Sequence, residues 1–171
     1  DFNHKIFRES GLLNNGGKAL HRGIEVSGAI YPVEGLKLYG SGAIQRATIE
    51  YGMNKGNRVP YAPRYTATAG AKYQCGVGEG TLTTNVYGNF VSSQFSDLAN
   101  TFEGSANGNV GLIPKFFLLN ATASYSYKQW NFNLNALNLL NRKYFTTRHN
   151  AWGGIMPAAT ISVLGGVGYQ F

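Results

Sequence analysis

The sequence is poor in charge, has a single cysteine and contains no long apolar run. Asp, Glu, Lys and Arg together make up 13% of its 171 residues, about half the share found in an average soluble domain. No stretch of about 18 apolar residues occurs, which excludes a transmembrane helix. The lone Cys75 cannot form an internal disulfide. Neither a charge-covered soluble domain nor a helical membrane protein fits this composition.

Glycine and aromatic residues are abundant instead. The chain has 23 Gly, 11 Tyr and 10 Phe, and its mean hydropathy is −0.19. Transmembrane β-barrels turn apolar side chains to lipid and polar ones to the lumen, so their mean hydropathy is ordinary. A soluble β-sandwich is the alternative, but it would carry more surface charge. The composition therefore favours an all-β, antiparallel transmembrane β-barrel.

The net charge of +7 does not indicate a nucleic-acid-binding protein. The Lys and Arg residues are scattered, with only Arg142 and Lys143 adjacent, and no basic run is interleaved with aromatics. Cations that line a lumen or a funnel of loops would attract an anionic ligand. His4, His21 and His149 are far apart in the sequence, and no paired carboxylates or Ser-His-Asp order stand out. The sequence therefore predicts neither an enzyme nor a protein with a cofactor or bound metal.

Alternation of apolar and polar residues predicts strands. It is sharpest at residues 130–135, where Trp, Phe and Leu alternate with three Asn. The side-chain amides of three asparagines on one strand face find few hydrogen-bond partners in a dry core, but water supplies these partners in a water-filled lumen. About eight strands are predicted, at residues 2–8, 19–31, 36–49, 64–73, 82–90, 117–127, 130–140 and 161–171.

The predicted connections alternate in length. Three are short, at residues 32–35, 76–80 and 128–129; four are long, at residues 9–18, 50–63, 96–114 and 143–158. Outer-membrane barrels have short periplasmic turns and longer extracellular loops. On this count the last strand runs from the outside to the periplasm and leaves Phe171 on the periplasmic side.

Three segments near the C-terminus carry a recognisable pattern: residues 130–134 (WNFNL), residues 138–144 (NLLNRKY) and the ending GYQF. They are similar to the closing two strands of the TonB-dependent receptors. Leu140 and Asn141 replace the Phe and Asp that are usual in the family's element before the last loop. HRGIE at 21–25 and NRVPYAP at 57–63 resemble two further family patterns, and FSDLANT at 95–101 is similar to the ferric-citrate and related siderophore receptors.

The resemblance implies a larger molecule than this chain. Family members have a 22-stranded barrel, a plug domain inside it, and a TonB-contacting box before the plug. Residues 1–171 would be the C-terminal part of the barrel, without plug or TonB box, so that Asp1 starts in mid-barrel and an export signal lies upstream. The whole receptor would bind and import a ferric siderophore or ferric citrate across the outer membrane of a Gram-negative bacterium. Its partners would be the TonB complex, the outer-membrane assembly machinery, and lipopolysaccharide and outer-membrane lipids.

Two other architectures remain open at this point. A self-contained eight-stranded outer-membrane barrel with a structural or adhesive role would need residues 2–8 to pair with residues 161–171. The weak alternation of residues 2–8 disfavours it. A soluble ligand-binding β-barrel would need its apolar faces turned inward.

Candidate ligand contacts lie in the long loops and at their rim. Arginine binds carboxylates and phosphates with two parallel hydrogen bonds, and ferric citrate and siderophore complexes are anionic. The candidates are Arg58, Arg64, Asn100, Arg148, Asn150 and Trp152. The alternative is that the cations bind lipopolysaccharide phosphates or are solvated loop charges. Tyr169 and Phe171 are the candidate assembly signal, and they would also anchor the last strand at the membrane interface.

Overall fold

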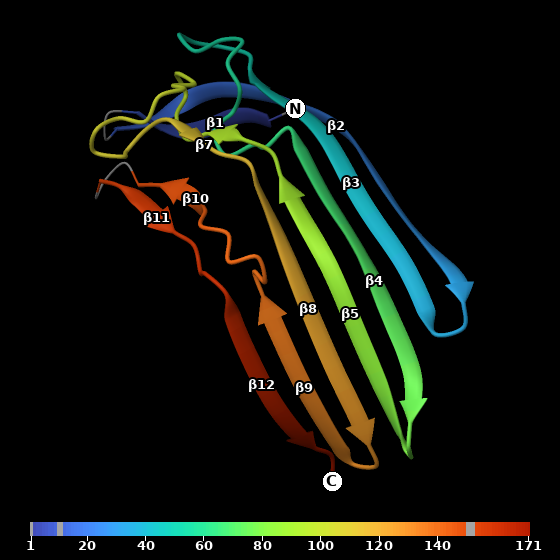
Figure 1. The fold of residues 1–171 in the computed structure, drawn as a ribbon. Coiled ribbons are helices and arrows are strands. Elements are labelled where there is room, and N and C mark those ends of the chain that lie inside the picture. The colour runs from blue at the N-terminus through green and yellow to red at the C-terminus, as the bar shows by residue number, and fades with distance from the viewer. Residues whose placement is uncertain (1, 10–11, 150–152) are drawn as a thin grey trace.

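The computed structural model describes residues 2–9, 12–149 and 153–171, with side chains from residue 18 onward. Eight antiparallel strands form one sheet in the order β1-β2-β3-β4-β5-β8-β9-β12 (Figure 1). The strands are β1 (Phe2–Glu9), β2 (Leu12–Val33), β3 (Leu36–Ile49), β4 (Tyr65–Val77), β5 (Gly80–Val91), β8 (Phe116–Tyr127), β9 (Trp130–Leu137) and β12 (Ser162–Tyr169). No helix among these residues is long and apolar enough to cross a membrane.

Two small ribbons lie outside the main sheet. β6 (Gln94–Phe95) pairs with β7 (Leu112–Ile113), and β10 (Phe145–Arg148) pairs with β11 (Ile155–Pro157). Both lie at the same end of the long strands, opposite the end where the C-terminus lies (Figure 1). The short turns at residues 34–35, 78–79 and 128–129 lie at the C-terminal end. The predicted separation of short turns from long loops is therefore confirmed for these connections.

The predicted long connection at residues 9–18 is wrong. Glu9 and Leu12 are partners in the β1–β2 ladder, which continues to the pair Phe2 and Ala19. The Asn- and Gly-rich stretch at residues 14–17 reads as a loop because it has no apolar alternation. It nevertheless belongs to β2, because Asn14 pairs with Phe7 and Gly17 pairs with Lys5, with a register shift between the two pairs. The strand predicted to reach Leu140 ends instead at Leu137, because Asn138 adopts a left-handed backbone conformation.

The register gives the sheet one apolar and one polar face. Residues directly opposite each other in antiparallel strands point to the same face. One such row, Val86–Ala121–Ala136–Val163, crosses four strands and is apolar. The neighbouring row, Asn85–Thr122–Asn135, is polar. The alternation therefore holds across the sheet, as predicted.

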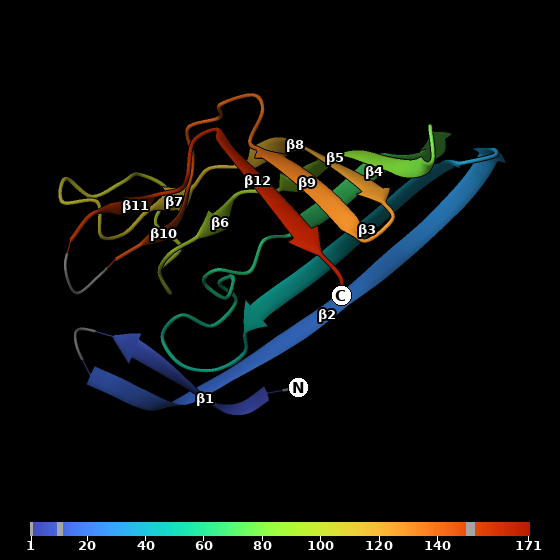
Figure 2. The same ribbon diagram turned by 90° about the horizontal axis from the view of Figure 1, so that it is seen from below.

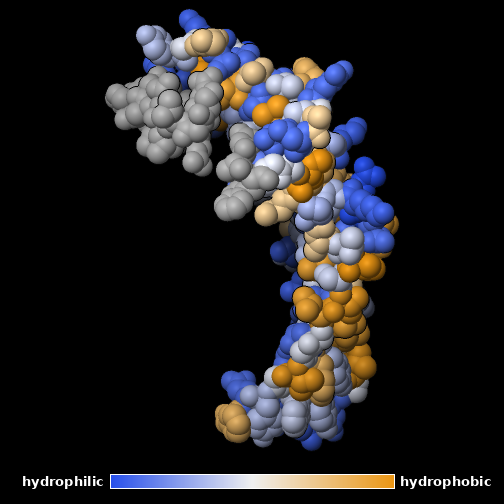
Figure 3. All heavy atoms as spheres, turned by 90° about the vertical axis from the view of Figure 1, so that its left-hand side faces the viewer, coloured by the Kyte–Doolittle hydropathy of each residue, from blue (hydrophilic) through white to orange (hydrophobic). Residues whose placement is uncertain are grey.

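The apolar face is bare and convex. Its side chains include Val26 at 68% exposure and Val163 at 61%. In Figure 3 the hydrophobic residues gather along the convex side of the curved sheet, over the half nearer the short turns, while hydrophilic residues dominate the loop end. A soluble barrel would have its apolar side chains on the concave face, so that alternative is wrong.

Aromatic side chains border this apolar face at the short-turn end. The ring of Tyr169 lies 4.8 Å from that of Trp130 and 5.1 Å from that of Phe171. Phe117 lies ten residues before Tyr127 on β8. Ten residues span about 33 Å along a strand, or about 25 Å of height at the tilt usual in such barrels. That height equals the apolar band of an outer-membrane barrel.

The sheet does not close on itself. β1 pairs with β2 alone and β12 with β9 alone among the described residues. β1 and β12 lie on well-separated edges of the curved sheet in Figure 2. β1 reaches only residues 12–19 of β2, so residues 20–33 have a sheet partner on one side only. The self-contained eight-stranded barrel needs β1 paired with β12, and the structure contradicts it.

Candidate ligand-binding loops

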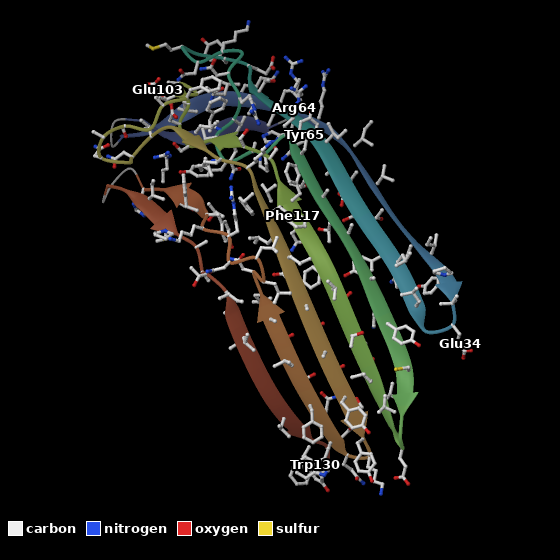
Figure 4. All side chains as sticks on the ribbon, viewed as in Figure 1. Glu34, Arg64, Tyr65, Glu103, Phe117 and Trp130 are labelled. Carbon is white, nitrogen blue, oxygen red and sulfur yellow. The ribbon has the colours of Figure 1, made fainter. Side chains whose placement is uncertain are left out.

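Three long loops meet at one end of the sheet. They connect β3 to β4 (residues 50–64), β5 to β8 (residues 92–115) and β9 to β12 (residues 138–161). The second carries β6 and β7, and the third carries β10 and β11 (Figure 1). Glu103, from the second loop, lies at this end, far from Glu34 and Trp130 at the short turns (Figure 4).

The first loop folds back along the edge of β3. Val59 N–H donates to the Ala47 carbonyl at 3.0 Å, and an isolated β-bridge joins Thr48 to Arg58. Ala19, Ala47, Ile49 and Val59 form a small buried cluster there, with Ala62 and Leu98 packed against it. The loop end thus has a water-excluding core of its own.

Arg58 and Asn100, both predicted ligand contacts, are brought together. Arg58 N–H donates to Asn100 Oδ1 at 2.7 Å, and Asn100 Nδ2 donates to the Arg58 carbonyl at 2.9 Å. The amide of Asn100 therefore behaves like the backbone of a paired strand. Asn100 tolerates its positive φ of 59° because asparagine adopts the left-handed region more readily than most residues. Its side chain holds the second loop to the first.

Arg58 also lies near Arg64. The Arg58 guanidinium donates to the carbonyls of Ala62 and Ser93 at 3.3 and 3.4 Å and lies 5.4 Å from the ring centroid of Phe95. Burial, followed by repulsion from Arg64, lowers the pKa of Arg58. Arg64 is exposed and reaches over the ring of Tyr65, 5.5 Å from its centroid. Arg58, Arg64 and Arg46 line one cavity of about 310 Å³.

Tyr61 connects the first loop to the third. Its N–H donates to the Phe95 carbonyl at 2.8 Å, and its hydroxyl donates to the Arg148 carbonyl at 2.9 Å. Burial raises the pKa of Tyr61. This bond joins residues 87 positions apart.

Arg148, another predicted contact, is buried with 8% of its surface exposed. Its Nη1 donates to the Gly108 carbonyl at 3.0 Å and its Nη2 to the Leu112 carbonyl at 3.1 Å. The guanidinium lies 5.1 Å from the ring centroid of Phe145. The side chain of Arg148 therefore holds the third loop to the second. Its carbonyl accepts the hydrogen bond from Tyr61 and so connects the third loop to the first.

Asn138 has a role that the sequence does not reveal. It lies in the NLLNRKY element and is 3% exposed, with φ of 52°. Its Nδ2 donates to the carbonyls of Arg142 and Ala159 at 3.0 and 3.1 Å, and its Oδ1 accepts from Arg142 N–H at 2.8 Å. Its own N–H donates to Asn120 Oδ1 at 3.0 Å. The side chain shapes the start of the third loop. The one clue that the sequence offered was the position of Asn138 at the start of the NLLNRKY element.

The remaining predicted residues fall in two places. Asn150 and Trp152 lie outside the described residues. Tyr169 and Phe171 lie at the short-turn end, and Gln170 N–H donates to the Gln129 carbonyl at 2.9 Å. Within the described part of the chain, no three His, Cys, Asp or Glu side chains are grouped to hold a metal ion.

The comparison with known families decides the identity of the fold. A model of the family "TonB dependent receptor-like, beta-barrel" matches residues 2–139 of the 171-residue chain. The chain belongs to the TonB-dependent receptors. The family is one of receptors, and its barrel strands account for the all-β antiparallel sheet with its apolar convex face.

Solved receptor structures share the fold. The ferric citrate transporter FecA in its unliganded form is 28% identical, with a TM-score of 0.79, over 97% of this chain and 26% of that one. BauA, the ferric preacinetobactin receptor from Acinetobacter baumannii, is 25% identical, with a TM-score of 0.74, over 93% and 23%. FyuA, the ferric yersiniabactin uptake receptor from Yersinia pestis, is 20% identical, with a TM-score of 0.73, over 91% and 24%. The chain spans about a quarter of the length of these structures.

Proposed function

We propose that the chain is the closing part of an outer-membrane TonB-dependent receptor that binds and imports an anionic ferric complex, either a ferric siderophore or ferric citrate. The observation that carries the proposal is the curved, open sheet with a bare apolar convex face and a polar concave face. Such a sheet suits the wall of a wider barrel, and its match to a ferric citrate transporter at 28% identity supports the ligand class. The remaining strands, to a total of 22, and a plug domain would come from elsewhere in the receptor.

The proposal assigns the three tied loops to ligand capture. Arg58, Asn100 and Arg148 use their polar atoms to hold the loops together, so we propose that they act by preserving the shape of the binding surface. Asn150 and Trp152 belong to the same third loop and are proposed as direct contacts. Import would draw its energy from the TonB complex, which contacts a part of the receptor beyond these strands.

Uptake by the full-length receptor tests this proposal. We expect cells that lack other iron receptors to accumulate radioactive iron from ferric citrate or from one ferric siderophore when they make this receptor. Uptake should stop when an uncoupler removes the proton-motive force, because TonB draws on it. The control measures binding of the ferric complex to purified receptor in competition with the same ligand without iron. Uptake that persists without the proton-motive force, or binding to none of these complexes, would sink the proposal.

Phe171 provides a second test, of assembly. We propose that the exposed terminal aromatics, Tyr169 and Phe171, form the signal read by the outer-membrane assembly machinery. Deleting Phe171 from the full-length receptor should lower its level in the outer membrane several-fold, measured by fractionation and blotting. The control is Phe102→Ala, which removes an exposed aromatic at the loop end. Equal outer-membrane levels of the deletion variant and the unmodified receptor would contradict the role in assembly.

A further inference from the structure

Two lysines face each other at the short-turn end of the concave face. Lys37 on β3 and Lys72 on β4 are direct cross-strand partners, and Lys72 is also the partner of Asn85 on β5. Asn85 belongs to the polar row that continues to Thr122 and Asn135. Because directly opposed residues point to the same side of a sheet, both lysine side chains lie on the polar, concave face.

Two tyrosines hold the side chain of Lys37. Its Nζ lies 5.9 Å from the ring centroid of Tyr31 and 5.8 Å from that of Tyr39, within the distance at which an aromatic face attracts a cation. The Tyr39 hydroxyl donates to Asn85 Oδ1 at 2.9 Å, so the tyrosine reaches across β4. Gly70 makes this possible, because a Cβ at that position would lie 2.6 Å from Tyr39 Cζ. The ammonium group is therefore positioned before any ligand binds.

No carboxylate neutralises the two lysines. Among the side chains that the structure describes, the one ion pair joins Lys128 to Glu79. Glu34 lies at the tip of the β2–β3 turn (Figure 4) and is not paired with either lysine. Like charges directly opposite each other in a sheet are destabilising. The juxtaposition of Lys37 and Lys72 therefore favours the binding of an anion.

A cavity of about 870 Å³ lies at the two lysines. Ligand pockets commonly have volumes of about 300–1,000 Å³. Besides the lysines, its lining includes Tyr31, Gln74 and Thr81. Ammonium, amide and hydroxyl groups all donate hydrogen bonds, and such a set of donors suits a ligand with many carboxylate oxygens.

We propose that Lys37 and Lys72 form a second, weaker binding site for the carboxylate groups of an anionic ferric complex, at the end of the lumen opposite the loops. The inference rests on the proposed function, in which the short-turn end faces the periplasm. The complex would reach this site after it has left the loops. A lysine binds as a point charge and lacks the two-pronged fork of arginine, so the site would also release the complex readily.

Calorimetric titration of the purified full-length receptor with ferric citrate tests the site, because both ends of the barrel are accessible in detergent. We expect one tight site at the loops and one weaker site. K37Q/K72Q should weaken the second site about tenfold or more, because it removes two charge-assisted contacts, and should leave the tight site unchanged. K37R/K72R keeps both charges and should retain the second site. An uncharged ferric trihydroxamate should not occupy the second site of the unmodified receptor, a result that does not depend on any variant folding.

Lys128→Gln is the matched control for the single variant Lys37→Gln. Lys128 also lies at the short-turn end, but it is absent from the lining of the cavity, and its Nζ lies 3.6 Å from Glu79 Oε2. Both variants remove one positive charge at the same end of the sheet. We expect Lys37→Gln to weaken the second site and Lys128→Gln to leave it unchanged.

Three outcomes would overturn the inference while the proposed function stands. The first is equal occupancy of the second site in K37Q/K72Q and the unmodified receptor. The second is an equal loss in Lys128→Gln, which would indicate a general effect of net charge. The third is a loss of the tight site, or a passive leak of dye from liposomes that contain K37Q/K72Q, which would indicate that the lysines hold an acidic segment of the receptor in place. If the unmodified receptor binds no ferric citrate at either site, the inference fails together with ferric citrate as the imported complex.

Discussion

Replacing Arg148 with alanine should loosen the loop end of the receptor while leaving the sheet intact. The guanidinium is the donor to two carbonyls of the second loop, Gly108 and Leu112, and it lies in a site that is 8% exposed. A hydrogen bond to a charged group contributes about 1.5–3 kcal/mol, and a buried carbonyl without its donor adds a desolvation cost. We therefore expect the local stability of the second and third loops to fall by about 3 kcal/mol.

Amide hydrogen exchange of the full-length receptor measures this effect directly. Residues 104–113 and 144–149 should exchange about a hundredfold faster in Arg148→Ala, because exchange follows the free energy of local opening. Strands β4, β5 and β8 should keep their protection. Arg148→Lys should give an intermediate rate, since one ammonium cannot replace the two-pronged guanidinium.

Arg142→Ala is the matched control for Arg148. Arg142 is an arginine of the same loop but is exposed, and only its backbone atoms contact Asn138. Its loss should leave exchange at the second loop unchanged. If Arg148→Ala and Arg142→Ala exchange alike, Arg148 does not tie the loops. If the proposed function holds, Arg148→Ala should also weaken binding of the ferric complex, because ordering the loops then costs free energy.

Asn138→Ala should be the most destabilising substitution at the junction between β9 and the third loop. The change removes three side-chain hydrogen bonds, to Arg142 N–H and to the carbonyls of Arg142 and Ala159. Each contributes about 1 kcal/mol. Alanine at a φ of 52° adds about 1 kcal/mol of backbone strain. We expect a loss of about 4 kcal/mol, measured as the change in unfolding free energy of the full-length receptor in urea.

Two further variants separate the loss of side-chain hydrogen bonds from the backbone strain. Asn138→Gly loses the same hydrogen bonds but relieves the strain, so it should be about 1 kcal/mol more stable than Asn138→Ala. Asn141→Ala changes an exposed asparagine with φ of 47° and one side-chain bond, from Ile161 N–H at 3.3 Å. It should cost about 2 kcal/mol or less. Equal losses in Asn138→Ala and Asn141→Ala would show that the buried network of Asn138 contributes little.

The faces of the sheet could be predicted from the sequence because strand geometry is strictly local. With a period of two residues, the run of Trp and Asn at 130–135 specifies both faces of β9, and the same holds along β8. The short turns could also be predicted from the sequence. Lys128, with a positive φ of 51°, lies in the two-residue turn at residues 128–129. The extension of β2 back to Leu12, in place of the predicted loop at residues 9–18, was missed because backbone pairing needs no apolar pattern.

The loops could not be predicted in the same way. The bond between Tyr61 and the Arg148 carbonyl joins segments 87 residues apart, and no local pattern specifies it. Arg58, Asn100 and Arg148 were selected because their side chains suit anion binding. The same hydrogen-bonding groups also suit loop carbonyls, and only the three-dimensional structure shows that those carbonyls are where they bind.

The distribution of buried apolar residues has a consequence for what stabilises each half of the molecule. Among the side chains that the structure describes, the buried apolar ones lie at the loop end: Ala19, Ala47, Ile49, Val59, Phe95 and Ile113. There the hydrophobic effect operates as in any water-soluble domain. If the proposed function holds, hydrocarbon contact stabilises the outer side chains of the strands below, and their inter-strand hydrogen bonds gain strength where water cannot compete. One continuous chain would then be stabilised by two solvents, and the change from one to the other would fall between the apolar band and the loops.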